Sequence, residues 1–513
     1  MIMNKKMVKE QTILFLILAT VSAGFVYYFS GSTSPIISDY YGDDSAMFQV
    51  IGKAWKNGLI PYEGTFDHKG PFIFLVNALG FLLGTNGMMI VQWIFMVAAF
   101  YGIYKIAGLF MGYRSSLLVT VLSYFVLVPT YGFGNYTEEY SLVFLTFSIY
   151  FGVKYFLKLD WSKKETLEHS WTYAVWYGIS FMCILLMRVT NALAICCIIF
   201  LVLCILLRYK MWKNIGENIA GFLLGCMIAF APFAIYFACH GALYDMIYGT
   251  LIHNVLYASN ASIFTEVGAA WRSACIALFT TILLMVVPAV YLFVYKGKQW
   301  ILGVYGLLAS CTAMVLFISI NRYLHYYMIS VPFFALAVGL TVKMKVHAKE
   351  HIIKRLAFYG VCAGIVLQVV LGIARTQRQS YSNHVFEDYA KAYKGCYEQL
   401  MSHVPREEYD DFLVFGSNAL SQWYLIGDIE PIYKYCFLQG WMSSCSSDIK
   451  KEVTAYLEQE PAKWLVVDAD FETEEMLENN SPEYVSIIKE RYELVDTAKM
   501  NNDFKCFQLY ERK

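Results

Sequence analysis

Five residues near the start of the chain carry the side chains that acid–base and phosphate chemistry need. Asp43 and Asp44 open a polar stretch, and Asp67, His68 and Lys69 lie close to its end. A carboxylate serves as a general base or a metal ligand, and a lysine neutralises a phosphate. The plainer interpretation of the two acids is helix capping, because an acid at a helix start satisfies its free N–H groups. One cap does not need two acids, so the functional interpretation, a carboxylate that acts as a general base or metal ligand at the interface, stays open beside capping.

The residues after the two acids predict an amphipathic helix. Met47, Val50, Ile51, Ala54 and Trp55 recur at helical spacing. Such helices are typical of the membrane–water interface, so we expect this one to begin at the acidic pair and to lie along the membrane surface.

The composition is that of an integral membrane protein. Hydrophobic residues make up 58% of the chain and charged residues 16%, against about 25% charged in a typical soluble domain. The mean hydropathy is +0.47. Lys plus Arg and Asp plus Glu are both 40, so the net charge gives no indication of a nucleic-acid partner, and the expected partner is the lipid bilayer.

Apolar runs long enough to cross a bilayer recur along most of the chain. The segment 171–208 alone would form a helix of roughly 57 Å, nearly twice the hydrocarbon thickness, so we divide it into two spans at Arg188–Asn191. About eleven spans result. The others are 11–30, 87–110, 115–131, 140–157, 216–239, 269–295, 301–318, 326–342 and 356–374.

The segment 72–84 is too short to cross the bilayer, and the distribution of charge among the loops supports the same conclusion. If it stays at the interface, the lysine- and arginine-rich loops all face the cytoplasm, as the positive-inside rule requires. Lys5, Lys6 and Lys9 precede the first span, which lacks a cleavage site and therefore reads as an anchor with a cytoplasmic N-terminus. We expect a membrane domain over 1–375 whose first outward loop is 31–71.

The remaining outward loops contain further polar side chains. Glu138 and Glu139 are either a second acidic site or a pair that marks the interface. Arg188 sits at a helix tip, where it either binds substrate or snorkels to the headgroups. Arg322 and His325 are placed for a lipid phosphate or for simple headgroup contact. The loop 240–266 has no motif, but its polar residues are expected to help enclose a substrate; they are Tyr244, Asp245, His253 and Asn254.

Three motifs in the first outward loop carry a family resemblance. They are Asp44-Ser-Ala-Met-Phe48, Gly58-Leu-Ile-Pro61-Tyr62 and Phe66-Asp67-His68-Lys69-Gly70-Pro71. The loop resembles that of the GT-C membrane glycosyltransferases, the polyprenyl-phosphate-dependent group that includes protein O-mannosyltransferases and aminoarabinose transferases. In that group an acid precedes an aromatic residue, a Gly-x-x-Pro-Tyr turn follows, and Lys-Pro-Pro opens a juxtamembrane helix. This chain has Lys-Gly-Pro, which is similar to a bacterial subgroup with the pattern D-H-K-G-P.

The resemblance implies roles for the loop residues. Asp44 takes the catalytic acid position and Lys69 the phosphate-binding position, with Tyr62, Asp67 and His68 beside the substrate. Weaker similarity follows at the second outward loop and at the segment that ends in Pro332, and the resemblance covers about the first 345 residues in topology. It implies that Asp43, Glu138 or Glu139 orients the base. If a divalent cation is used, the resemblance implies Asp44 and Glu138 as its ligands; no other cofactor is expected.

From 376 to 513 the composition is that of a soluble protein. We predict a small extracytoplasmic α/β domain with strands over 412–416, 464–468 and 504–510 and helices over 448–458 and 482–492. Four of the 13 cysteines lie there, and disulfides or free thiols both fit an exported domain. They are Cys396, Cys436, Cys445 and Cys506.

The sequence therefore predicts an all-α polytopic membrane protein of GT-C type with a small C-terminal α/β domain. The expected activity is that of an inverting hexosyl- or pentosyltransferase that moves a sugar from a polyprenyl phosphate to a cell-envelope acceptor. Two alternatives are open. A transporter or flippase would place ionisable groups within its spans, and an O-antigen-type polymerase or ligase would carry its chemistry in a large late loop.

Overall fold

The computed structural model describes residues 5–260, 271–318, 323–416, 418–438, 440–459, 461–468, 482–500 and 506–513. The chain forms two compact units, each built from three separate segments. The first unit comprises Met1–Ser30, Gln92–Phe233 and Ser262–Gln379, and the second comprises Gly31–Val91, Ala234–Ala261 and Ser380–Lys513.

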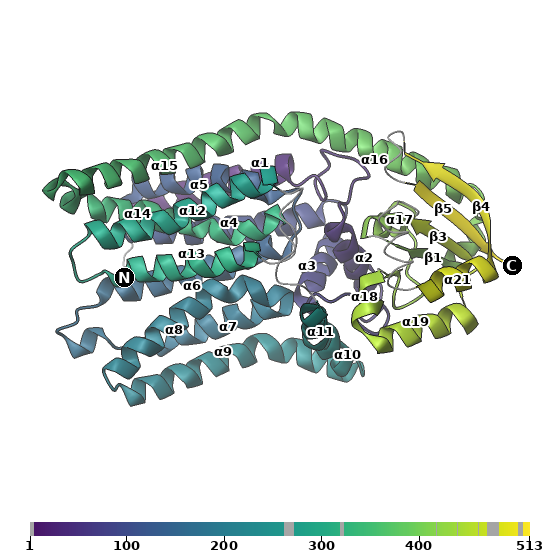
Figure 1. Cartoon of the computed structure of the whole chain (residues 1–513), viewed down its shortest axis with the longest axis horizontal. Helices are drawn as coiled ribbons and strands as arrows, with labels where there is room; N and C mark the ends of the chain where they lie inside the picture. The colour runs from purple at the N-terminus through teal and green to yellow at the C-terminus, as the bar shows by residue number, and fades with distance from the viewer. Residues whose placement is uncertain are drawn as a thin grey trace. The chain divides into compact units, whose positions relative to one another are not determined.

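The first unit consists of long apolar helices that lie side by side (Figure 1). Two of them, α4 and α9, also extend into the second unit. In chain order the helices are α1 (Lys5–Phe29), α4 (Gly87–Ala107), α5 (Tyr113–Tyr131), α6 (Thr137–Lys158), η1 (Lys164–Thr166), α7 (Trp171–Arg188), η2 (Val189–Ala192), α8 (Leu193–Arg208), α9 (Trp212–Cys239), α12 (Trp271–Val294), α13 (Ile301–Ile318), η4 (Leu324–Ser330), α14 (Pro332–His347), η5 (Ala348–Glu350) and α15 (Ile352–Gln377).

The described residues include seven helical segments long and apolar enough to cross a bilayer. An eighth results if the pair Leu324–Ser330 and Pro332–Glu350, bent by 43°, is counted as one span. Leu283–Val294 and Ile301–Ala313 are apolar but shorter. A polytopic helical membrane protein is thus confirmed, while the total of eleven spans stays a prediction.

The segment from α7 to α8 forms a helical hairpin, as its length predicted. Ala174 and Tyr177 near the start of α7 line the same cavity as Val202 and Leu206 near the end of α8. The two helices are therefore antiparallel, and the chain reverses at η2. On the other side of α7, a Cβ at Gly178 would lie 2.0 Å from the carbonyl oxygen of Phe222 in α9. Such close backbone approach at a small residue is typical of helix packing in membranes.

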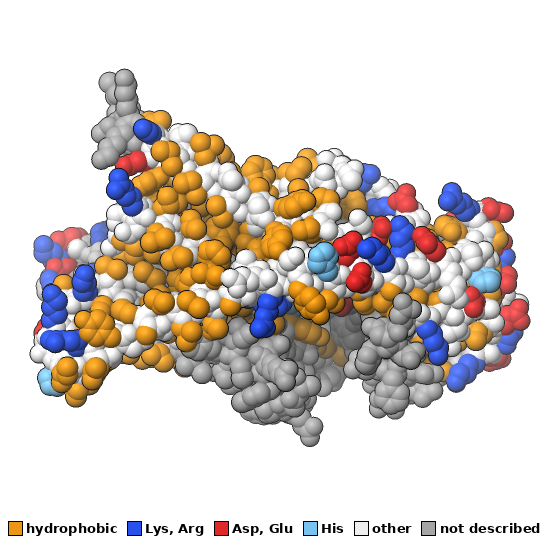
Figure 2. Space-filling model, turned by 90° about the horizontal axis from the view of Figure 1, so that it is seen from above, with side chains coloured by type: hydrophobic (Ala, Val, Ile, Leu, Met, Phe, Trp, Pro, Cys, Tyr) orange, Lys and Arg blue, Asp and Glu red, His pale blue; other side chains and the backbone are white. Residues whose placement is uncertain are grey.

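The surface of this unit fits a membrane environment. Hydrophobic side chains cover most of its visible face on the α15 side, and Lys and Arg gather at the end that Figure 1 draws at the left (Figure 2). Exposed residues at that end include Lys163, Lys164, Arg208, Lys210 and Lys213.

The second unit combines short helices with a five-stranded sheet of order β2-β1-β3-β5-β4. The strands are β1 (Phe412–Phe415), β2 (Phe437–Leu438), β3 (Trp464–Asp468), β4 (Tyr492–Lys499) and β5 (Cys506–Arg512). β1 pairs in parallel with β2 and β3, whereas β5 is antiparallel to β3 and β4. The predicted strands and helices of the α/β region are confirmed, and β2 and β4 were not predicted.

Helices complete this unit. They are α2 (Asp44–Lys56), α3 (Pro71–Leu82), α10 (Leu243–Ile247), η3 (Tyr248–Ile252), α11 (His253–Asn260), α16 (Gln379–Met401), η6 (Arg406–Asp411), η7 (Asn418–Ser421), α17 (Gln422–Ile426), α18 (Gly440–Cys445), α19 (Ser447–Gln459) and α21 (Pro482–Arg491). Of these helices, α16, α19 and α21 are drawn beside the sheet (Figure 1). In the described part of this region, Cys396 and Cys436 are free thiols.

Helix α2 begins at the predicted place but is more enclosed than a surface helix. Residues 45–52 and Ala54 are buried, because α2 packs against α3, α17 and η7. Polar contacts tie it to the C-terminal segment: Lys53 pairs with Asp428, and the Asn57 amide donates to Glu430. The apolar stripe of α2 thus contacts protein.

Candidate functional site

The N-termini of α2 and α3 lie at the same end of the helix pair. Phe48 contacts Phe74 with ring centroids 6.3 Å apart, and one turn later a Cβ at Gly52 would lie 2.5 Å from that of Asn77. Both helices therefore run in the same direction. The loop 57–70 returns along the length of α2 and brings Lys69 to the end at which Asp44 begins the helix.

Within this loop, three consecutive side chains form a chain of polar contacts. The Lys69 ammonium donates to Nε2 of His68 over 2.6 Å, and Nδ1 of His68 lies 3.3 Å from a carboxylate oxygen of Asp67. The other Asp67 oxygen accepts the backbone N–H of Lys69 at 2.8 Å. The Asp67 carboxylate is buried. Asp67 and His68 thus hold the lysine that the sequence singled out.

Electrostatics favours a charged Asp67 and a neutral His68. Burial alone raises the pKa of Asp67, but the His68 imidazole and the Lys69 ammonium and N–H together hold it below its usual range. Burial and the Lys69 charge lower the pKa of His68, against the opposing pull of Asp67 and Asp44. A neutral imidazole can accept a hydrogen bond from the Lys69 ammonium at Nε2.

Tyr62 belongs to the same loop and contacts the backbone of Lys69. Its hydroxyl donates to the backbone oxygen of Lys69 at 2.6 Å, and its N–H bonds the oxygen of Thr65. Tyr62 is fully buried and has φ of +70°, a region that bulky residues rarely adopt. Burial raises the pKa of Tyr62 well above its usual value, so the phenol stays protonated and keeps this bond.

A second segment, from η3 and α11, packs on the loop. The Asn254 amide donates to the backbone oxygen of His68 at 2.6 Å, and the Thr250 hydroxyl donates to that of Tyr62 at 3.3 Å. The buried His253 ring meets Phe66 edge to face. Burial lowers the pKa of His253 to about 4. The sequence marked His253 and Asn254 as polar, but no spacing linked them to the first loop.

Asp43 differs from Asp44 in its surroundings. It is exposed, and its side chain makes no cap hydrogen bond to α2. The pKa of Tyr393 in α16 is raised, mainly because this side chain is buried. Neighbouring charges, Asp43 among them, contribute less. The capping interpretation of Asp43 is therefore wrong.

In the first unit, Glu138 and Arg188 form a buried ion pair. The Arg188 guanidinium donates to Glu138 at 2.8 Å and lies 3.5 Å above the ring of Tyr326. Glu138 also accepts from the Thr137 hydroxyl. Arg188 is thus already occupied by a carboxylate and an aromatic ring, a contact set that a snorkelling arginine would not make.

Glu139 belongs to a separate network of hydrogen bonds. Its carboxylate accepts from the Tyr131 hydroxyl at 2.7 Å, the Gln92 amide at 3.0 Å and the backbone N–H of Asn135 at 2.8 Å. These bonds fix the turn before α6. His325 stacks on Tyr136 at 4.2 Å. The remaining candidate, Arg322, lies outside the described residues.

The donors for a metal ion do not come together in the part of the chain that the structure describes. Those residues contain no group of three or more His, Cys, Asp or Glu side chains placed to hold an ion. Asp44 and Glu138 belong to different units.

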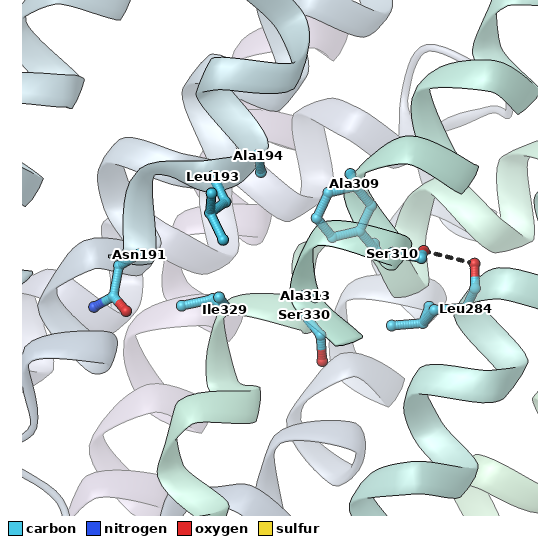
Figure 3. A pocket seen from close by; sticks show the side chains of 10 residues that line it. Asn191, Leu193, Ala194, Leu284, Ala309, Ser310, Ala313, Ile329 and Ser330 are labelled. Carbon is cyan, nitrogen blue, oxygen red and sulfur yellow. Dashed lines mark hydrogen bonds between the residues drawn. The ribbon is translucent and has the colours of Figure 1, made fainter. Parts of the chain in front are cut away.

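A small cavity lies beside the turn that carries Arg188. It has room for about one water molecule, with a volume of ≈ 20 Å³. Figure 3 shows that aliphatic side chains line most of it, and that the Ser310 hydroxyl bonds the backbone oxygen of Leu284 at 2.9 Å. Asn191 points away toward Ser141, to which its amide donates. This cavity offers no chemistry.

No protein-family model matches the chain, and no curated protein matches it in sequence. Solved structures match it in fold. ArnT from Cupriavidus metallidurans, bound to undecaprenyl phosphate, aligns with a TM-score of 0.54 at 10% identity, and the alignment covers 97% of this chain and 98% of the ArnT chain.

The Archaeoglobus fulgidus oligosaccharyltransferase with Zn and sulfate aligns with a TM-score of 0.48 at 14% identity, covering 94% of this chain and 71% of its own. AglB from the same organism, with an inhibitory peptide and a dolichol-phosphate, aligns at 0.46 and 13% identity, covering 96% and 73%. By its long apolar helices the chain is a multi-pass membrane protein. Its fold is that of ArnT, matched over nearly the whole length of both chains.

Proposed function

We propose that the protein is an inverting glycosyltransferase that moves a hexosyl or pentosyl group from a polyprenyl phosphate to a cell-envelope acceptor. The observation that carries this proposal is the meeting of Asp44 and the Asp67–His68–Lys69 chain at one end of the α2–α3 pair. A general base and a cation for a phosphate leaving group are thereby supplied by one rigid element pair.

In the reaction, Asp44 takes the proton of the acceptor hydroxyl. The hydroxyl oxygen attacks the anomeric carbon, the bond from that carbon to the phosphate oxygen breaks, and its electron pair leaves with the polyprenyl phosphate. A single displacement of this kind inverts the anomeric configuration. The Lys69 ammonium neutralises the charge that grows on the leaving phosphate.

The roles of the other candidates follow from their contacts. His68 and Asp67 orient Lys69, and Tyr62 holds its backbone. Glu138 and Arg188 form a second polar group, within the first unit. Arg322 and His325 are proposed to lie near the lipid phosphate.

We also propose the orientation and the domains. The end of the first unit at which Lys and Arg gather faces the cytoplasm, in keeping with the positive-inside rule. The N-terminus then lies inside, and residues 376–513 form an extracytoplasmic soluble domain next to the membrane domain 1–375.

The test is to compare cells with and without the protein. Loss of one sugar from a surface glycan, together with accumulation of the matching polyprenyl-phosphate sugar, supports the proposal. If the protein were a flippase, its loss would instead leave the lipid-linked substrate on the cytoplasmic face, where an impermeant sugar-modifying reagent does not reach it. Unchanged glycans and unchanged lipid-linked sugars would reject the proposal.

A further inference from the structure

A second cavity lies between α7, α8 and α9, away from the site described above. Its volume is ≈ 190 Å³ and its lining is almost wholly apolar. An engineered apolar cavity of about 150 Å³ stays dry and binds benzene. A cavity of this size is therefore large enough for part of a hydrocarbon chain.

The cavity opens toward the outer surface of the helices. Its inner wall is made of buried side chains, among them Val202 and Leu206, whereas Ile219 and Leu223 of α9 and Leu203 of α8 are exposed. In a helix that crosses a bilayer, exposed leucine and isoleucine face lipid tails. An apolar chain can thus enter sideways from the bilayer.

Two polar atoms of lining residues are buried and make no hydrogen bond to protein. They are Nε2 of His169 and the hydroxyl of Tyr177. The opposite edge of His169 is fixed, because Nδ1 lies 2.5 Å from the side-chain oxygen of Asn218 and the His169 N–H donates to Asn214. A buried polar group without a partner is costly. The Tyr177 hydroxyl can donate to an ester oxygen, and Nε2 of His169, whose Nδ1–H donates to Asn218, can accept from a hydroxyl such as that of a glycerol headgroup.

Lysine and arginine outnumber acids at the end of the helices nearest the cavity. Arg208 ends α8, Lys210 follows in the turn, and Lys213 lies in the first turn of α9. Lys213 also approaches Glu217 at 3.8 Å. The connection from α6 to α7 at this end contributes two more lysines and two acids, Lys163, Lys164, Glu165 and Glu168. A basic pocket of this kind between membrane helices suits an anionic headgroup.

We propose that this cavity binds one anionic glycerophospholipid. One acyl chain fills the apolar space, the ester region lies at His169 and Tyr177, and the phosphate lies at Arg208 and its neighbours. The site is separate from the proposed donor site. Tyr177 and Arg188 are eleven residues apart on α7, which corresponds to roughly 16 Å along a helix.

The test uses the full-length protein in a neutral detergent. Dioleoyl phosphatidylglycerol and dioleoyl phosphatidylcholine are titrated separately, and binding is followed by native mass spectrometry and by the shift in melting temperature. We expect phosphatidylglycerol to bind at least ten-fold more tightly and to raise the melting temperature. Val202→Trp, which fills the cavity, should abolish this shift, whereas Ile228→Trp on the exposed part of α9 should retain it.

A charge variant keeps the test informative if Val202→Trp does not fold. Arg208→Gln/Lys213→Gln lies on the surface and should weaken phosphatidylglycerol binding about five-fold for each charge removed, with phosphatidylcholine unaffected. Equal affinity for the two lipids, or phosphatidylglycerol binding that neither variant weakens, would overturn the proposal. So would a co-purified isoprenoid lipid that Val202→Trp displaces.

Discussion

The ammonium of Lys69 lies 2.6 Å from Nε2 of His68, so one of its protons faces a histidine that is itself anchored on Asp67. His68→Ala should therefore raise the KM for the polyprenyl-phosphate donor about ten-fold while kcat changes less, because the ammonium loses its fixed position. His68→Gln retains an acceptor and should recover part of the affinity. A purely structural His68 would instead lower the melting temperature and leave the KM of the folded fraction unchanged.

The buried His253 predicts a pH dependence of stability. Its pKa is about 4 in the folded protein and about 6.5 in an unfolded chain. As the pH falls below 6.5, the unfolded chain binds a proton that the folded protein does not, so stability decreases toward pH 4, by on the order of 3 kcal/mol. Melting temperatures from pH 7.5 to 4.5 measure this effect. His253→Phe should flatten the profile, and an unchanged slope would contradict the assignment.

Gly52 sets the distance between α2 and α3. A Cβ there would lie 2.5 Å from the Cβ of Asn77 and 2.8 Å from the backbone of the following residue. Gly52→Ala should therefore destabilise the protein by about 1–3 kcal/mol and lower activity, because Asp44 and Lys69 depend on the parallel packing. Gly395→Ala in α16, where a Cβ meets nothing within 4 Å, is the matched control. Equal melting temperatures for the two variants would reject this role.

The Glu138–Arg188 pair distinguishes a structural acid from a catalytic one. Glu138→Gln leaves Arg188 without its countercharge, and breaking a buried pair costs about 3–5 kcal/mol. We expect a marked decrease in melting temperature. The double variant Glu138→Gln/Arg188→Gln removes both charges and should recover part of the loss. Full stability of Glu138→Gln with loss of sugar transfer would instead assign the carboxylate to catalysis.

The sequence predicted the local elements well where one pattern dominated. The hairpin of α7 and α8 followed from its length and from the basic loops on both flanks, α3 from an apolar run of about a dozen residues, and the strands β1 and β3 from their valine- and phenylalanine-rich runs. β4 was missed because Tyr492–Lys499 alternates weakly and mixes charges with apolar residues.

Long-range associations were harder to predict. The packing of α2 against α17 and η7 joins residues more than 350 positions apart, and the amphipathic stripe of α2 fits a membrane surface as well as a protein surface. Likewise, the pairing of Arg188 with Glu138 joins the end of α7 to the start of α6, and no spacing within either segment indicates it. The order within Asp67–His68–Lys69 could be seen, but the direction of each contact required the structure.

The central claim is that Asp44 is the base for sugar transfer. The most direct measurement compares wild type with Asp44→Asn, purified and supplied with its polyprenyl-phosphate sugar donor and acceptor, and follows both transfer and donor binding. We predict that Asp44→Asn binds the donor with unchanged affinity and melts at the same temperature, but transfers sugar at least a hundred-fold more slowly, within the range that a general base contributes. Asp43→Asn should have a milder effect. Full turnover by folded Asp44→Asn would contradict the account.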